Sequence, residues 1–277
     1  MEIPLTSTSS STGTLSKGKR VDPTRDSLSI LMPVMNEGLN LKIMLKILRA
    51  TMDVEHEVLV VCDSLEDTSI PVVRAMQPDY PNLRLIYNNL GRGVVNAIRA
   101  GVAEAHGSII LIFAADEVGP VLAIEDMLAL IREGSDFVSC TRYGSGGRRL
   151  GGSMVGQILS RTANSLFHRL AGCGLTDATT GIKMFRKEIF DKLDLCSRPI
   201  GWAVAFEMAI KAQALGLRLG EVPIISIDRL YGGESTFKLG PWTGEYLRWF
   251  WWGVLHLRGE NGAKAPVEVR TPSHLRE

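Results

Sequence analysis

The chain has 277 residues, of which 45% are hydrophobic, and its formal net charge is +1. This length is sufficient for one large domain with a sizeable core. The near-neutral charge has no polyanion-binding signature, so nucleic acid is not expected as a partner. No run of about 18 apolar residues occurs, which predicts that no helix spans a bilayer, and the N-terminus lacks the apolar core of a signal peptide.

The four cysteines (Cys62, Cys140, Cys173 and Cys196) are far apart and form no C-x-x-C or Cys/His cluster. We expect buried, reduced thiols and a cytoplasmic protein, rather than a disulfide framework or a zinc site. Residues 1–26 are rich in Ser and Thr and poor in apolar residues, which predicts a disordered tail. Residues 259–277 have a similar character.

Between these tails, apolar strands alternate with helices. The predicted strands are Ser27–Met35, Glu57–Asp63, Leu83–Asn88, Ser108–Ala114 and Asp136–Arg142. The first predicted helix begins near Asn36, and three further helices are predicted at Ile70–Met76, Gly93–His106 and Val121–Glu133. This rhythm indicates an α/β fold with a mostly parallel sheet that helices cover on both faces, and ligands then bind at the carboxyl ends of the strands.

The second half follows a different pattern. A Gly-rich loop precedes a predicted helix at Met154–Leu170, and a second helix is expected at about Ala203–Leu215. A strand-like segment covers 217–229, and a Trp-rich segment follows at 242–258. We expect residues 27–241 to form one domain.

Polar residues follow the first two strands. In PVMNE, Pro33 shapes a turn, while Asn36 and Glu37 either present polar groups to a ligand or cap the next helix. In VVCDSLEDTS, Asp63 is suited to accept hydrogen bonds from a base or a ribose, and Asp67 either joins it or caps a helix.

The segment GRGVVNA places Gly91 and Arg92 before a helix. A third glycine is missing and the segment follows the third strand, so a dinucleotide fingerprint is a poor interpretation. A close approach of the backbone to a nucleotide, with Arg92 near phosphate, is reasonable.

The stretch LIFAADEVGP ends a strand on Asp116, and Ala114 stands two residues before it. Mg²⁺ and Mn²⁺ prefer oxygen ligands and complete their shells with phosphate and water. One carboxylate plus a diphosphate is a minimal metal site, whereas a lone Asp after a strand is more often a helix cap.

Basic residues are scattered through the second half, at strand ends and in Gly-rich loops: Arg142, Arg148, Arg149, Lys183, Arg229 and Lys238. Each alone is an ordinary solvated cation, but phosphate groups are the natural partners of such residues in binding loops.

The segment 242–257 carries aromatic and small residues at helical spacing: Trp242, Tyr246, Trp249, Phe250 and Gly253. Together with Arg248 and Arg258, they indicate an amphipathic helix at a membrane interface. The alternative is a helix packed on the core or on a partner subunit.

In this order the motifs resemble glycosyltransferase family 2, in its dolichol-phosphate mannosyltransferase-like branch, over roughly Leu28 to Leu257. PVMNE is similar to P-x-Y-N-E, VVCDSLEDTS to V-D-D-G-S-x-D-G-T, and FAADEVGP to M-D-A-D-L-x-x-x-P. CTRYGSGG is similar to G-T-R-Y, TDATTGIKMFRKEIF to S-D-L-T-G-S-F-R-L-Y-R-K-E, and GEVPIISIDRLYGGESTFKL to E-V-P-I…D-R…G-E-S-K.

The resemblance implies a GT-A fold and inverting transfer of a sugar from a GDP- or UDP-sugar to a polyprenyl phosphate. No strong base is needed, because the acceptor phosphate is already an anion; positioning and charge stabilisation then carry the catalysis. The enzyme would lie peripherally on the cytoplasmic face of the membrane, and a homo-oligomer is possible.

The resemblance also assigns roles. Pro33, Asn36, Glu37, Asp63 and Asp67 would hold the nucleoside, with Gly91 and Arg92 beside it. Asp116 would hold Mg²⁺ or Mn²⁺ at a site that Ala114 weakens, while Arg142, Ser160 and Arg229 would bind phosphate groups. Asp116, Arg142 and Arg229 are thus the expected catalytic residues, and Lys183 and Lys238 are secondary candidates. Gly156 replaces a basic residue of the family, for which Arg148 or Arg149 would substitute.

Two alternatives remain open from the sequence. A soluble glycosyltransferase acting on a small molecule, a glycan or a protein would need a base, for which Glu207 is the candidate. A non-catalytic homologue is the other.

Overall fold

The computed structural model describes residues 26–151, 154–227, 239–257 and 266–273. Residues 1–25 of the predicted disordered tail 1–26 lie outside these residues, as do Arg229, Lys238 and Arg258. Within them the chain runs as β1 Leu28–Val34, α1 Gly38–Thr51, β2 His56–Cys62, α2 Ser69–Met76, β3 Leu83–Tyr87, α3 Val94–Glu104, β4 Ile109–Ile112, α4 Ile124–Glu133, β5 Phe137–Thr141, β6 Arg148–Leu150, α5 Met154–Leu170, β7 Lys183–Arg186, α6 Ala203–Ala214, β8 Leu219–Pro223, β9 Ile225–Ile227, α7 Leu239–His256 and β10 Val267–Val269.

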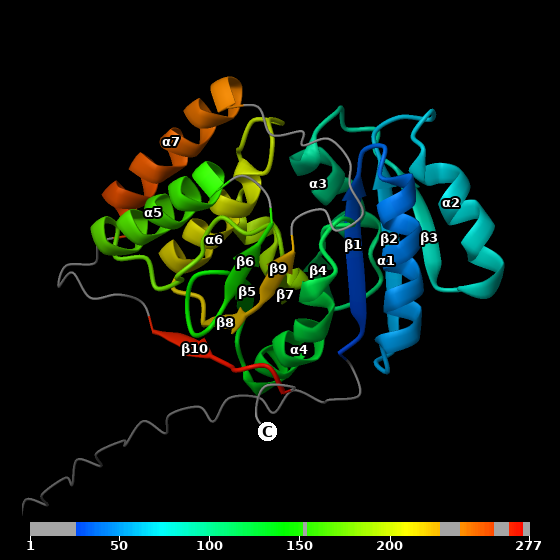
Figure 1. Cartoon of the computed structure of the whole chain (residues 1–277), viewed down its shortest axis with the longest axis horizontal. Coiled ribbons are helices and arrows are strands. Elements are labelled where there is room, and N and C mark those ends of the chain that lie inside the picture. The colour runs from blue at the N-terminus through cyan, green and yellow to red at the C-terminus, as the bar shows by residue number, and fades with distance from the viewer. Residues whose placement is uncertain (1–25, 152–153, 228–238, 258–265, 274–277) are drawn as a thin grey trace, which may run out of the picture.

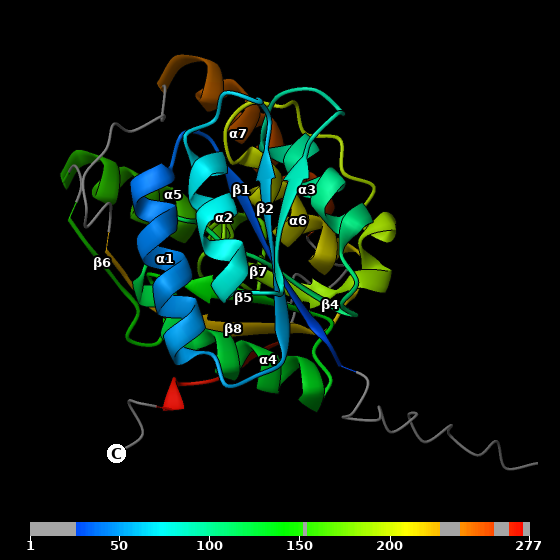
Figure 2. The same cartoon turned by 90° about the vertical axis from the view of Figure 1, so that its right-hand side faces the viewer.

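The main sheet has the order β10-β8-β5-β7-β4-β1-β2-β3, and within it only β7 is antiparallel to its neighbours. Figure 1 shows these strands between layers of helices. One buried apolar cluster joins the sheet to α1, α2 and α4, and a second joins it to α3, α5, α6 and α7. Figure 2 shows α1 and α2 side by side on one face, with α6 and α7 behind the strands. The predicted α/β fold is therefore confirmed.

The strand order creates the crevice that matters for ligands. From β1 the chain moves outward to β2 and β3 and then returns to β4 on the other side of β1. Ligands bind at such a switch point, outside the carboxyl ends of the parallel strands. Because β7 is antiparallel, its first residue, Lys183, and the loop before it lie at this same edge.

Three strands differ from the sequence expectations. Arg148–Leu150 falls in the predicted Gly-rich loop but forms β6, which pairs with β9. Residues 183–186, for which no element was predicted, form β7 in the middle of the sheet. Val267–Val269 falls in the segment predicted as a disordered tail but pairs with β8 as an edge strand. Arg270 ties this strand to α4 by ion pairs with Asp126 and Glu133, which explains why a polar segment is ordered.

The aromatic stripe of α7 faces the protein, as in the alternative interpretation. Trp249 is 1% exposed, and Tyr246 and Phe250 pack against the core. Gly253 touches the ring of Phe167 on α5 so closely that a Cβ would collide with it. Trp249, Tyr246 and Phe250 therefore face the protein and not a membrane, whereas an interfacial role for the helix at 242–258 remains a prediction. Among the described helices, none is long and apolar enough to cross a membrane.

Candidate active site

The turn after β1 and the loop after β2 are joined by hydrogen bonds. Asn36, in a left-handed conformation with φ 58°, donates its backbone N–H to Asp67 Oδ2 at 3.0 Å and accepts from the Thr68 N–H at 3.3 Å. The other Asp67 oxygen accepts from the Ser69 N–H at 2.8 Å. The buried Asp67 carboxylate therefore joins the first residue of α2 to the Pro33–Glu37 turn and orders this corner of the site.

Asp63 holds the neighbouring loop in the same way. Its Oδ1 accepts from Asn88 Nδ2 at 2.6 Å, and its Oδ2 accepts from the Gly93 N–H at 2.7 Å. Asn88 also donates to the Gly91 carbonyl at 2.7 Å. Both glycines have positive φ, which other residues rarely adopt. The predicted donor residues thus lie on three linked segments, which follow β1, β2 and β3 at one edge of the sheet, with Arg92 exposed.

The segment after β4 places Ala114 and Asp116 half-buried at this edge. In the described part of the chain, no group of three or more His, Cys, Asp or Glu side chains could hold a metal. The protein thus offers one predicted ligand, the Asp116 carboxylate, which fits only a metal whose other ligands come from donor phosphates and water. Gly119 then passes against the Ile225 carbonyl, which brings β9 beside this segment.

Arg142, directly after β5, is fixed by the buried carboxylate of Asp177, for which no role was predicted. Its Nε and Nη2 donate to the two oxygens of Asp177 at 2.7 and 3.1 Å, and Nη2 also donates to Thr179 Oγ1 at 3.2 Å. Asp177 is fully buried, and although burial raises its pKa, the charge and hydrogen bonds of Arg142 hold that pKa below its usual value. Nη1 has no hydrogen bond within the described residues, so its two donors are not committed to the protein.

Ser160 and Arg142 are linked through the turn that follows β5. Tyr143 donates its hydroxyl to Ser160 Oγ at 2.8 Å, and its ring lies beneath the Arg142 guanidinium at 5.2 Å. Asn164, one turn further along α5, donates to the Ser160 carbonyl and to Thr179 Oγ1. The predicted phosphate-binding residues Arg142 and Ser160 therefore belong to one network. The loop TDATT, quoted for its family resemblance, was the available signal for Asp177.

Two predicted roles do not fit the structure. Lys183 is fully buried on β7 and donates to Ser139 Oγ at 2.7 Å and the Ala178 carbonyl at 3.3 Å, so its amine is not presented to a phosphate. Burial lowers its pKa to about 8. Glu207 is also fully buried, and its oxygens accept from the N–H groups of Cys196 and Ser197. It anchors a loop and is not placed to act as a base.

The remaining basic candidates lie beside the site. Arg148 and Arg149 are on β6, which pairs with β9 in a small two-stranded sheet. In turn, β9 lies against Gly119, which follows the Asp116 segment. Cys196 is exposed, unlike the other three cysteines, which are buried as expected; all four are free thiols.

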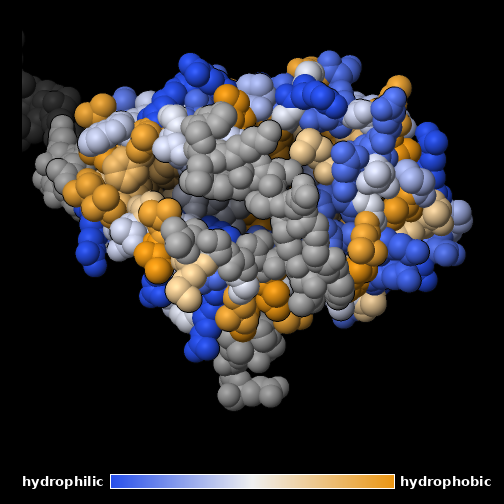
Figure 3. Space-filling view, turned by 45° about the horizontal axis from the view of Figure 1, so that its top comes forward, coloured by the Kyte–Doolittle hydropathy of each residue, from blue (hydrophilic) through white to orange (hydrophobic). Residues whose placement is uncertain are grey.

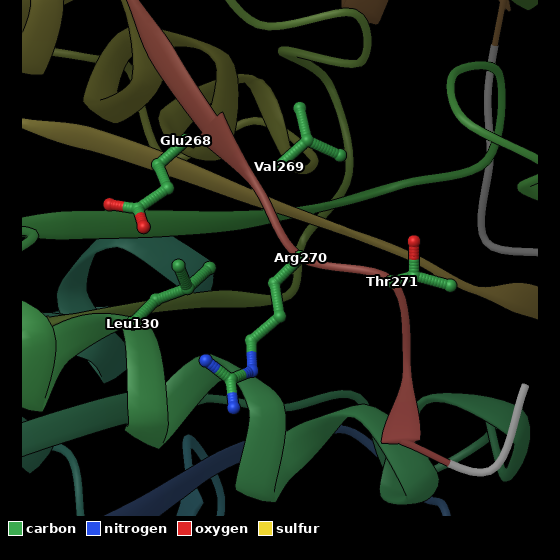
Figure 4. A pocket seen from close by; sticks show the side chains of 5 residues that line it. All are labelled: Leu130, Glu268, Val269, Arg270 and Thr271. Atoms are coloured by element: carbon green, nitrogen blue, oxygen red, sulfur yellow. The ribbon is translucent and has the colours of Figure 1, made fainter. Parts of the chain in front are cut away.

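One surface pocket lies elsewhere, between β10 and α4. It is lined by Leu130, Glu268, Val269, Arg270 and Thr271 (Figure 4). The guanidinium of Arg270 points from β10 toward α4, where it pairs with Asp126 and Glu133. None of the predicted site residues lines this pocket, so we place the candidate active site at the strand ends instead.

Comparison with known proteins defines the class. Residues 29–194 match the model of glycosyl transferase family 2, which is more than half of the chain. The chain is 28% identical over 225 residues to a dolichol-phosphate mannosyltransferase from Pyrococcus furiosus; the match covers 80% of this chain and 62% of that protein. It is 24% identical to a polyprenol monophosphomannose synthase from Mycolicibacterium smegmatis, with 80% of this chain and 88% of that protein covered. The chain thus spans less than two thirds of the Pyrococcus relative's length.

Solved structures agree on the fold. Glucosyl-3-phosphoglycerate synthase from Mycobacterium tuberculosis in complex with phosphoglyceric acid superposes with a TM-score of 0.65 at 16% identity, covering 92% of each chain. The same enzyme with Mn²⁺, UDP-glucose and phosphoglyceric acid gives a TM-score of 0.63 at 17% identity, and the match covers 83% of this chain and 80% of that chain. The protein belongs to glycosyltransferase family 2. It is a nucleotide-sugar glycosyltransferase, similar to the dolichol-phosphate mannosyltransferase-like branch.

Proposed function

We propose that this enzyme transfers a sugar from a GDP- or UDP-sugar to a polyprenyl phosphate, by inversion, at the surface of a membrane. The observation that carries the proposal is the Arg142–Asp177 pair. It fixes a guanidinium with two spare donors at the same edge of the sheet as the Asp63 and Asp67 loops and Asp116. Curated relatives that bear the names of polyprenyl-phosphate mannosyltransferases support the acceptor class.

The chemistry requires orientation more than proton transfer. A phosphate acceptor is an anion at neutral pH and attacks the anomeric carbon without a protein base. Arg142 would orient the acceptor phosphate and offset repulsion between it and the donor diphosphate. Asp116 would hold Mg²⁺ or Mn²⁺ together with the diphosphate, and the metal would supply charge stabilisation for the leaving group. The burial of Glu207 removes the base on which the soluble alternative relied.

The surface formed by α5 and α7 supports contact with lipid. Its exposed apolar side chains are Met154, Ile158, Leu159, Leu166, Leu170, Leu247, Trp251 and Leu255. The sequence of α5 contains Arg161 and Arg169 and no acidic residue, and the one carboxylate of α7, Glu245, is buried against Arg248. Orange surface gathers at the left of Figure 3, on the side where Figure 1 places these helices. An apolar surface with only positive exposed charges suits an anionic bilayer.

The transfer assay uses a panel of nucleotide sugars with a short-chain polyprenyl phosphate, in Mg²⁺, Mn²⁺ or EDTA. A lipid-extractable product that disappears with EDTA supports the acceptor class and the metal at Asp116. A product that still forms in EDTA supports the acceptor class but shows that transfer does not require a metal at Asp116. No product with any donor, alongside transfer to a water-soluble acceptor, would refute the proposal.

Membrane contact is tested by sedimentation with vesicles of phosphatidylglycerol and phosphatidylcholine. Trp251→Ser with Leu255→Ser removes two side chains that are 59% and 75% exposed, and binding should fall on the order of 10-fold. Leu39→Ser is the matched control, because Leu39 is 63% exposed on α1, on the other face of the sheet. Equal binding by all three proteins would contradict a lipid-facing role for α7.

A further inference from the structure

A buried carboxylate lies behind the Arg142 network and contacts no predicted ligand residue directly. Glu221 is on β8, next to β5, and is 1% exposed. Its Oε1 accepts from the backbone N–H groups of Thr176 at 2.8 Å and Asp177 at 3.2 Å. Its Oε2 accepts from Thr176 Oγ1 at 2.8 Å. Three donors from two successive residues therefore fix the start of the loop that precedes β7.

The first consequence concerns Arg142. The backbone N–H of Asp177 is bound to Glu221, while its side chain receives the Arg142 backbone N–H, Nε and Nη2. A guanidinium that is held bidentately keeps its plane only if the carboxylate itself is fixed. Glu221 fixes that carboxylate from the other side of the loop.

The second consequence concerns the turn that carries Tyr143. The Thr176 hydroxyl lies 2.7 Å from Thr141 Oγ1, and Thr141 Oγ1 accepts from the N–H groups of Tyr143 and Gly144 at 3.1 Å each. Gly144 approaches Thr176 so closely that a Cβ would collide with its hydroxyl. Tyr143 then binds Ser160. Glu221 is thus connected to Arg142 and to Ser160, two of the predicted phosphate-binding residues, by two separate chains of hydrogen bonds.

The position is energetically unfavourable for a carboxylate. Burial raises the pKa of Glu221 to about 7, against the opposing effect of the Thr176 and Asp177 hydrogen bonds. A well-packed apolar residue would avoid this desolvation cost. The carboxylate gives the loop three hydrogen bonds that an apolar residue cannot make.

We propose that Glu221 is a positioning residue for the acceptor phosphate, acting through Asp177 on Arg142 and through Thr176 and Thr141 on the Tyr143–Ser160 pair. This inference rests on the proposed function, in which Arg142 binds that phosphate. Glu221 does not touch the substrate. Its removal should therefore change how the acceptor binds and reacts while leaving the donor loops on β1 and β2 unaffected.

The test compares Glu221→Gln, Thr176→Val and a matched control, Glu57→Gln. The glutamine amide cannot accept from both the backbone N–H groups and the Thr176 hydroxyl, and valine removes that hydroxyl at nearly constant shape. Glu57 also accepts hydrogen bonds from a hydroxyl, a backbone N–H and an arginine, but it lies at the amino end of β2, away from the site. Apparent KM is measured separately for the donor and for a short-chain polyprenyl phosphate, and hydrogen exchange is followed for residues 141–145 and 175–179.

For Glu221→Gln we expect the ratio kcat/KM for the acceptor to fall on the order of 10-fold, with donor KM within about twofold of the parent value. Thr176→Val should show a smaller change in the same direction. Amide exchange should accelerate in both segments for these variants and in neither for Glu57→Gln. If Glu221→Gln does not fold, Thr176→Val alone decides the question.

Unchanged exchange in residues 141–145, or an equal loss of donor and acceptor affinity, would overturn the positioning role. If the parent enzyme transfers no sugar to polyprenyl phosphate, the proposed function fails. The exchange measurement still decides whether Glu221 fixes the two segments. The two failures are therefore distinguishable.

Discussion

Replacing Asp177 by Asn tests the buried ion pair on which the proposed acceptor site depends. The carboxylate is fully buried and accepts hydrogen bonds from three nitrogens of Arg142 and from the N–H and hydroxyl of Thr179. Its partner, the Arg142 side chain, is only 11% exposed. The variant therefore leaves a guanidinium buried without its counter-charge, which costs roughly 3–5 kcal/mol of unfolding free energy.

The measurement is urea unfolding near neutral pH, with Asp79→Asn as the control. Asp79 forms an exposed pair with Arg49 at 3.9 Å, and such pairs contribute about 0–1 kcal/mol. Because the pKa of Asp177 is lowered in the folded state, its contribution is present above the unfolded pKa and is lost as the pH falls below about 4. The difference in unfolding free energy between parent and variant should thus be constant from about pH 5 to 8 and become smaller in acid. If Asp177→Asn lowers the unfolding free energy by less than about 1 kcal/mol near pH 7, Asp177 is not the buried counter-charge of Arg142.

Three further predictions concern other parts of the molecule. Burial raises the pKa of Glu221 to about 7, so its contribution to the free energy of unfolding is greatest below its unfolded pKa, near 4.5, and declines as the pH rises through 7. Glu221→Gln should lack that decline when urea unfolding is measured between about pH 5 and 8. An identical pH profile for parent and variant would contradict the raised pKa. Gly253→Leu should overpack the contact with Phe167 and cost about 1–3 kcal/mol, measured by thermal unfolding, whereas a neutral effect would mean that α7 is free to move away from α5. Ala114→Asp adds a second carboxylate near Asp116 and should lower the Mg²⁺ or Mn²⁺ concentration for half-maximal transfer by about 10-fold; an unchanged metal requirement would show that position 114 does not face the metal.

The helix α7 shows how a correct element can be given the wrong orientation. Its length and aromatic content were visible in the sequence, and the structure has the helix at Leu239–His256. Spacing alone groups Trp249 with Tyr246 and Phe250 but does not say what that face contacts. The rings of Phe167 and Phe206 cover it, and they come from α5 and α6. The exposed face instead contains Leu247, Trp251 and Leu255.

The sequence by itself determined the alternating strands and helices, the polar residues after each strand, and the family. These signals are local, since hydrophobic periodicity and strand-end motifs are set by neighbours along the chain. Asp63, Asp67 and Asp116 were found in this way, and their predicted roles toward a ligand remain predictions.

Only the tertiary structure decided which charges meet. Arg142 and Asp177 are 35 residues apart, and Glu221 lies 44 residues beyond Asp177. The insertion of β7 between β4 and β5 brings the loop before it to the carboxyl ends of the parallel strands. The same fold buries Lys183, which the sequence presented as one more basic residue. Burial and partners decide whether a charge binds a ligand or holds a loop, and both depend on contacts that no local pattern encodes.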